Sequence, residues 1–214
     1  MLLLETPLQA TDNYTLLDTE SQYTLSLHRT GFNDDKEYKR FIKNVERLVR
    51  GSIEYKEWVS FGKFTLGYDY CLFSLENDQE TDDIEIHHHP FTLYDIVDLV
   101  AAKKIMNGEK FCTLNVAEEV LKLHYELKIG FVPLSGTLHK KYHNGFLAIP
   151  REFILGDYQY LLKNFPLSDE QREKIQSKLS VSLLDGTVPD SLDIYLGVKL
   201  AKARGVEALL RRHK

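Results

Sequence analysis

Two separated histidine clusters constrain this chain most. Three consecutive histidines at positions 87–89 precede Pro90, and His139 and His143 follow about fifty residues later. These two short segments hold five of the eight histidines in the sequence. The first has the pattern of a strand end and the second that of one face of a helix. Which folds and functions are possible therefore depends on whether the two clusters meet in space.

The composition excludes several classes of protein. The 214 residues are 43% hydrophobic, and no run approaches the roughly 18 apolar residues that a membrane span needs. Only two cysteines occur, which excludes a disulfide framework and a cysteine-rich zinc site. They indicate a protein of the cytoplasm, or of the host cytoplasm if the chain is viral. The net charge of −5 argues against a protein that coats nucleic acid non-specifically, but it does not exclude an enzyme with a local basic patch.

Residues 1–83 predict an N-terminal strand-helix-strand region. Alternating residues indicate one or two strands within 14–30, and apolar residues at helical spacing indicate a helix over about 36–59, where Gly51 is a potential interruption. Aromatic and β-branched residues predict one or two strands over 61–75, and an acidic loop follows. The outer face of the predicted helix is basic, with Lys36, Lys39, Arg40, Lys43, Arg47 and Arg50.

Residues 84–150 predict a core of mixed secondary structure, with caps that fix several boundaries. Thr92 and Ser135 are expected N-caps, and Asn144-Gly145 is an expected helix stop. The expected elements are a strand over 84–88, helices over 93–106 and 115–127, a strand over 129–134, a helix reaching His143 and a strand over 146–149.

Residues 151–214 predict a helical extension. Helices are expected over 151–164, from a cap at Ser168, and over about 191–212, where the sequence is basic. Pro166 and the loop at 185–189 are candidate boundaries. The whole pattern predicts an α+β protein with three parts, 1–83, 84–150 and 151–214.

The spacing within each cluster suits metal chemistry. His139 and His143 are four residues apart, so on a helix both imidazoles share one face and can bind one ion. His87 and His88 are adjacent on a strand and point to opposite sides, so one can join the ion while the other serves a different atom. In metal-assisted phosphodiester cleavage the ion stabilises charge on the phosphate, and a neutral histidine accepts a proton from water. The two clusters therefore predict such a centre if they meet.

Both segments resemble the HNH, or His-Me finger, nucleases, most closely the colicin DNase subgroup. Residues 85–90 (Glu-Ile-His-His-His-Pro) resemble its first strand, and 131–145 resemble its second strand and helix. The resemblance implies a ββα-metal finger, here with a helical insertion and embedded in a larger mixed domain. It implies His87, His139 and His143 as metal ligands and His88 as general base. His88 and His89 are an alternative register for the first pair.

The expected cofactor and partner follow from this reading. Imidazole ligands favour Zn²⁺, Ni²⁺ or Mn²⁺ over Mg²⁺. Carboxylates are expected on the outer ring nitrogens, with Glu85, Asp95 and Asp98 as candidates. Lys140 and Lys141 are candidate phosphate contacts. The expected partner is nucleic acid, with DNA favoured, and not a membrane.

Two other interpretations stay open. His87, His89 and Asp95 resemble a shortened zinc motif of JAB/MPN metalloproteases, in which an upstream glutamate, Glu54 or Glu57 here, would act as acid and base. Alternatively, the chain is a non-catalytic binding or virion-type structural protein whose histidines hold a structural metal or only stack. Closed coordination by four protein ligands would favour that last interpretation.

Overall fold

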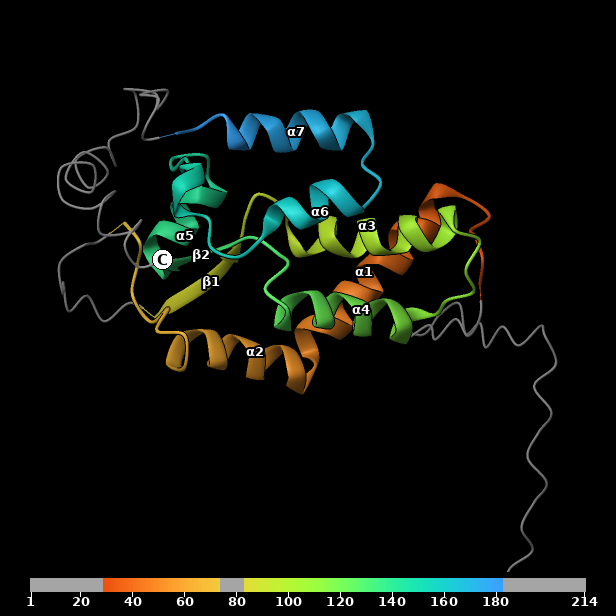
Figure 1. The fold of residues 1–214 in the computed structure, drawn as a ribbon, viewed down its shortest axis with the longest axis horizontal. Coiled ribbons are helices and arrows are strands. Elements are labelled where there is room, and N and C mark those ends of the chain that lie inside the picture. Colours follow the sequence, from red (N-terminus) through yellow and green to blue (C-terminus); the bar gives the residue numbers. More distant parts are fainter. Residues whose placement is uncertain (1–28, 74–82, 183–214) are drawn as a thin grey trace, which may run out of the picture.

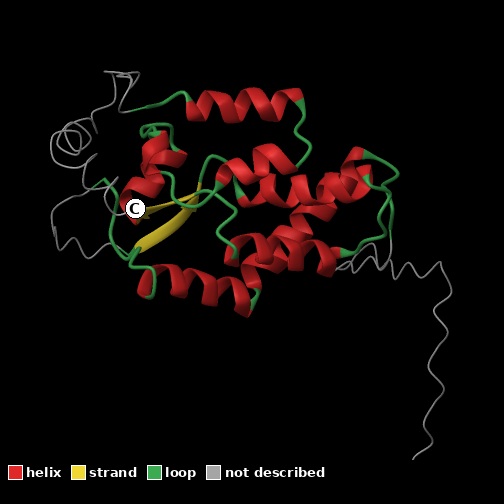
Figure 2. Cartoon of the chain, in the orientation of Figure 1, coloured by secondary structure: helices red, strands yellow, loops and turns green. Residues whose placement is uncertain are grey.

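The chain folds into a group of packed helices with a small antiparallel sheet at one side (Figure 1, Figure 2). The computed structural model describes residues 29–73 and 83–182. The expected helix over 191–212 lies outside the described residues, as do nearly all of the expected strands over 14–30 and of the acidic loop. In the described parts the predicted mixture of α and β structure is confirmed, and helix predominates.

Two helices open the described chain where one interrupted helix was expected. α1 (Asp35–Gly51) and α2 (Ile53–Phe64) meet at Ser52. The Ser52 backbone N–H donates to the Val49 carbonyl at the end of α1, and its hydroxyl caps α2 by accepting from the Tyr55 N–H. The interruption at Gly51 is therefore confirmed.

The expected strands over 61–75 are wrong for residues 61–73, which are the part of that range that the structure describes. α2 continues to Phe64, and residues 65–73 form turns and bends. Trp58 and Gly62 lie on the buried face of α2, and a Cβ on Gly62 would lie 3.2 Å from Ile86 Cδ1. The aromatic and β-branched residues here serve helix packing against the sheet. Strand propensity is weak because it mostly reports half-buried surroundings, which a helix also provides.

The sheet consists of β1 (Ile84–His88) and β2 (Phe131–Ser135). The strands are antiparallel, with Ile84 opposite Ser135 and His88 opposite Phe131. Both were expected, β2 within two residues of its observed bounds. The strand expected over 146–149 is wrong, because this segment contributes buried side chains to the core without pairing in the sheet.

The helices between and after the strands follow the predicted caps. α3 (Leu93–Met106) begins at a capping box of Thr92 and Asp95, and α5 (Gly136–His143) begins at Ser135. α4 (Thr113–Tyr125) lies beside α3, and α1 packs across both.

The C-terminal described segment is more broken than expected. The helix predicted over 151–164 divides into a 3-10 turn (Arg151–Phe153) and α6 (Tyr158–Asn164), because Leu155 pairs with Phe131 and Gly156 adopts a φ of +77°. α7 (Asp169–Leu179) begins at the predicted Ser168 cap. Buried residues from every named α-helix except α5 join one hydrophobic cluster, against which Leu138 and Tyr142 of α5 pack while partly exposed. The three-part division of the chain stays a prediction.

Gly130, directly before β2, packs closely against His89 and Tyr158, so a larger residue at this position should destabilise the protein. A Cβ on Gly130 would lie 2.1 Å from the His89 carbonyl oxygen and 2.8 Å from Tyr158 Cβ. We expect Gly130→Ala to lower the free energy of unfolding by about 3 kcal/mol, as for an overpacked core. Urea denaturation measures this. Gly31→Ala is the control, since a Cβ there meets nothing within 4 Å, and it should change stability by less than about 0.5 kcal/mol.

Candidate metal centre

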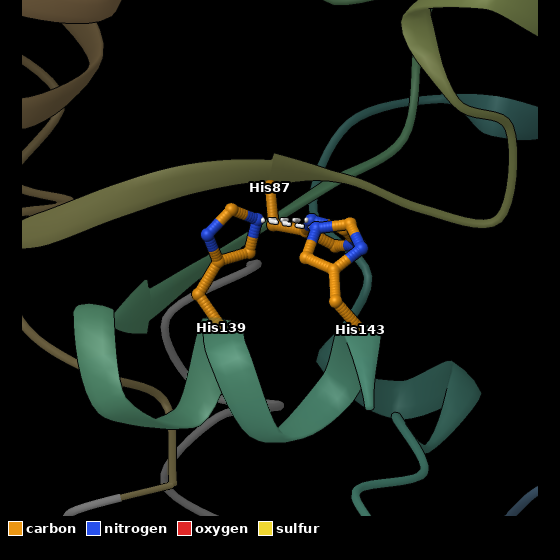
Figure 3. Close-up of side chains that lie close together, drawn as sticks. All are labelled: His87, His139 and His143. Carbon is orange, nitrogen blue, oxygen red and sulfur yellow. Dashed lines mark hydrogen bonds between the residues drawn. The ribbon is translucent and has the colours of Figure 1, made fainter. Parts of the chain in front are cut away.

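Three of the predicted metal ligands meet in space. β1 carries His87 and α5 carries His139 and His143, and one ring nitrogen from each lies within 4.8 Å of the others (Figure 3). The facing atoms are His87 Nδ1, His139 Nε2 and His143 Nε2, and the two hydrogen bonds that join them are each 2.9 Å long. This is the only group of three or more potential metal-ligating side chains within residues 29–73 and 83–182. We name His87, His139 and His143 the histidine triad.

Local structure explains how the triad forms. Ser135 ends β2 and caps α5, so the helix starts opposite Ile84 at the beginning of β1. Figure 3 shows α5 running beside β1, with both helical imidazoles pointing toward the strand. Their spacing of four residues places them one turn apart on that face. Gly145, with a φ of +78°, follows directly after the helix.

A carboxylate fixes the orientation of one ligand. Glu85 Oε2 lies 2.6 Å from His139 Nδ1, on the ring edge away from the triad. An Nδ1–H that donates to Glu85 leaves the Nε2 lone pair of His139 directed into the triad. Glu85 and His87 are two residues apart on β1 and so share a face of the strand. Of the three candidate carboxylates, Glu85 is therefore the one that the structure places beside a ligand.

The triad favours neutral imidazoles. Burial, together with repulsion from His139, His89 and His143, lowers the pKa of His87 to about 3. Burial also lowers the pKa of His139, although Glu85 acts in the opposite direction. A neutral ring offers the lone pair that a metal ion needs. The two nitrogens that face away from the triad differ in their surroundings. His87 Nε2 is buried without a hydrogen-bond partner, whereas His139 Nδ1 lies against the Glu85 carboxylate.

One side of the triad is accessible. His87 is buried, His139 is half-buried and His143 is exposed. Lys140 and Lys141 lie on the exposed side of the same helix. Zinc sites commonly have four ligands, and catalytic ones have three from the protein with one open position. The accessible triad matches the open arrangement, with the predicted phosphate contacts nearby in sequence.

His88 does not join the triad. Its ring points to the other side of the sheet, where its Nε2 lies 2.9 Å from His124 Nε2 and its plane stacks on Trp58 and Tyr55. His124 Nδ1 in turn lies 2.6 Å from the Val120 carbonyl oxygen. Burial lowers the pKa of His88 well below its usual value. His88, expected as the general base, is thus placed in the hydrophobic core, away from the accessible side of the triad.

Sequence reasoning missed two neighbours of these histidines. His124 is fully buried, and its spacing of four residues from Val120 could have placed it on the buried face of α4 from the sequence alone. Tyr142 contacts the His87 ring at 4.5 Å between centroids, and its hydroxyl lies 3.2 Å from His89 Nδ1. His89 therefore lies on the triad side of β1 without being one of its members.

The ligand set of the metalloprotease interpretation is not assembled. Asp95 accepts hydrogen bonds from the backbone and hydroxyl of Thr92 and pairs with Lys174 at 3.1 Å. Asp98 is engaged by Tyr38 and Gln171. Neither carboxylate belongs to the metal-ligating group, so the resemblance to JAB/MPN proteases has no geometric support in the described residues.

Removal of one imidazole should abolish tight metal binding. His139 lies between the other two ligands, so we expect His139→Ala to weaken Zn²⁺ binding by more than the roughly 10–100-fold that loss of an outer carboxylate costs. Isothermal titration of metal-stripped protein should give one ion per chain for the wild type. Lys140→Ala, on the exposed side of the same helix, is the matched control and should bind normally.

The Glu85 carboxylate should tune this affinity. Glu85→Gln keeps the side-chain shape but weakens the acceptor for His139 Nδ1–H, so we expect Zn²⁺ affinity to fall by roughly 10–100-fold. The same titration measures it. Asp95→Asn is the control, because that carboxylate contacts no member of the triad. Equal loss in both variants would contradict a specific role for Glu85.

Comparison with known proteins places the chain in one family. A family model described as "Bacteriophage G278-like virion protein" matches residues 2–188. No curated protein and no solved structure matches the chain significantly. Within the described residues, no helix combines the length and apolar character required to cross a bilayer.

Proposed function

The chain belongs to the bacteriophage G278-like virion protein family, and from this membership and the histidine triad we propose that it is a metal-dependent endonuclease of a phage particle. It would hold one divalent transition-metal ion on His87, His139 and His143 and hydrolyse phosphodiester bonds of nucleic acid. DNA is the favoured substrate, and a cytoplasmic or host-cytoplasmic location stays a prediction.

The convergence of the triad is the observation that carries this proposal. Two segments far apart in sequence bring three imidazole nitrogens within 4.8 Å, which is a spacing suited to one ion. The order β1, β2, α5 around the triad supports the resemblance to ββα-metal nucleases, with α3 and α4 as the insertion between the strands. We propose that these three elements are such a finger.

The residues around the triad have separate tasks in this mechanism. A bound divalent ion would polarise a phosphate oxygen and acidify a coordinated water. His87, His139 and His143 supply neutral nitrogen donors, and Glu85 keeps His139 oriented. The exposed side at His143 admits the phosphodiester, and Lys140 and Lys141 bind its backbone charge. His88 has no part, since its ring is paired with His124 in the core.

A non-catalytic metal-binding virion protein is the second candidate. Two observations favour it: the family description names a virion protein, and the expected base His88 lies in the core. In that case the ion would tie α5 to β1, and its remaining coordination position would be filled by a further ligand. The two candidates share the metal site and differ in what occupies that position.

Plasmid cleavage distinguishes these functions. We expect metal-stripped protein to nick or linearise supercoiled DNA after Zn²⁺, Ni²⁺ or Mn²⁺ is added, because the exposed triad leaves a position for phosphate. His139→Ala should be inactive, and Lys140→Gln with Lys141→Gln should raise KM more than it lowers kcat. Agarose gels with a supercoiled substrate measure each rate.

His88→Ala is the informative control. It should lower thermal stability through a cavity and an unpaired His124, while cleavage per folded molecule persists. Loss of cleavage in a fully folded His88→Ala protein would restore His88 as the base. A protein that binds one ion tightly but cleaves neither DNA nor RNA with any of these metals would establish the non-catalytic candidate.

A further inference from the structure

The outer face of α1 is a concentrated positive surface on an acidic chain. We define the α1 basic face as Lys36, Lys39, Arg40, Lys43 and Arg47, all of which are exposed. The opposite side of the helix is buried in the core through Phe41, Ile42, Val45 and Val49. The whole chain has a net charge of −5, so this positive cluster is opposite in sign to the protein as a whole.

Four of the five cations of this face form no ion pair with another described residue. These four are Lys36, Lys39, Arg40 and Lys43. A shallow hollow on this face is lined by the same five basic residues, together with Asp35 and Asn44. Exposed like charges on one helix face repel one another, and a bound polyanion would relieve that repulsion.

The geometry suits a phosphate backbone. From residue 36 to residue 47 the cations extend about 16 Å along the axis, at a rise of 1.5 Å per residue. Duplex DNA carries roughly one charge per 1.7 Å of its axis, so several phosphates face such a row at once. Membrane-surface helices instead combine a basic face with large exposed apolar residues. The apolar side of α1 is buried in the core, and its one exposed large apolar residue, Leu48, is only 37% exposed, which favours nucleic acid over a lipid surface.

We propose that the α1 basic face is a nucleic-acid-binding surface that contacts the phosphate backbone without reading sequence. It is built on a different element from the triad, and its binding requires no metal. In the proposed nuclease it would hold the substrate, yet it would serve a non-catalytic virion protein equally well. An experiment can therefore refute nucleic-acid binding by the α1 basic face without refuting the metal site, and the reverse.

Salt-dependent DNA binding tests this surface. Fluorescence anisotropy with a labelled duplex in the presence of a chelator measures affinity without cleavage. For Lys39→Gln with Arg40→Gln and Lys43→Gln, we expect weaker binding and a log–log salt slope smaller by about 2.7, at about 0.9 per lost phosphate contact. Glutamine is a good helix former, so α1 should persist, and circular dichroism verifies this.

The matched control removes the same charge elsewhere. Lys56→Gln with Lys163→Gln and Arg172→Gln alters three exposed cations on α2, α6 and α7, and it should retain the wild-type salt slope. An equal loss in both triple variants would overturn the proposal, because net charge alone would then explain binding. Wild-type protein that binds phosphatidylglycerol vesicles but not the duplex would also overturn it, in favour of a membrane surface.

Discussion

The antiparallel pairing of β1 with β2 is the interaction on which the rest of the candidate site depends. It places Ser135 opposite Ile84, so that α5 begins where β1 begins and then runs beside it. His139, 52 residues after His87 in sequence, thereby comes within hydrogen-bond distance of it. The intervening helices α3 and α4 pack on α1 instead of on the triad, which leaves this side of β1 to α5. The histidine triad is thus a consequence of strand register.

Strand alternation then divides three consecutive histidines between two environments. His87 and His89 lie on the side of α5, whereas His88 lies between Trp58, Tyr55 and His124. Both sides of β1 are covered at this end, so burial keeps all three rings neutral and lowers the pKa of His87 and His89 to about 3. Neutrality favours metal ligation on one side and a histidine–histidine hydrogen bond within the core on the other.

Features with a local cause were predictable from sequence. The caps at Thr92, Ser135 and Ser168 and the four-residue spacing of His139 and His143 each depend on neighbouring residues. The strands expected over 61–75 and 146–149 failed because the same apolar residues fill a helix face or a loop against the core.

The position of His88 could not be predicted from neighbouring residues, because it too depends on tertiary packing. Alternation predicts that His87 and His88 point apart, but not that α2 and α4 cover the second side and convert an expected base into a core residue. Only the packing of Trp58 and His124 on that side decides this. The proximity of His87 to His139 and His143 was predictable because it required contact on one side of β1 only, which the helix after β2 supplies.

Metal binding at the histidine triad would be linked to local folding whichever function the site serves. α5 has eight residues, none of them buried, so little apolar burial holds it against the sheet. Isolated helices of this length are unstable in water. An ion shared by β1 and α5 would bind only their docked arrangement, so its binding free energy would stabilise that docking. A catalytic site and a structural clamp would thus share the same three ligands, and the chemistry at the accessible fourth position alone would separate them.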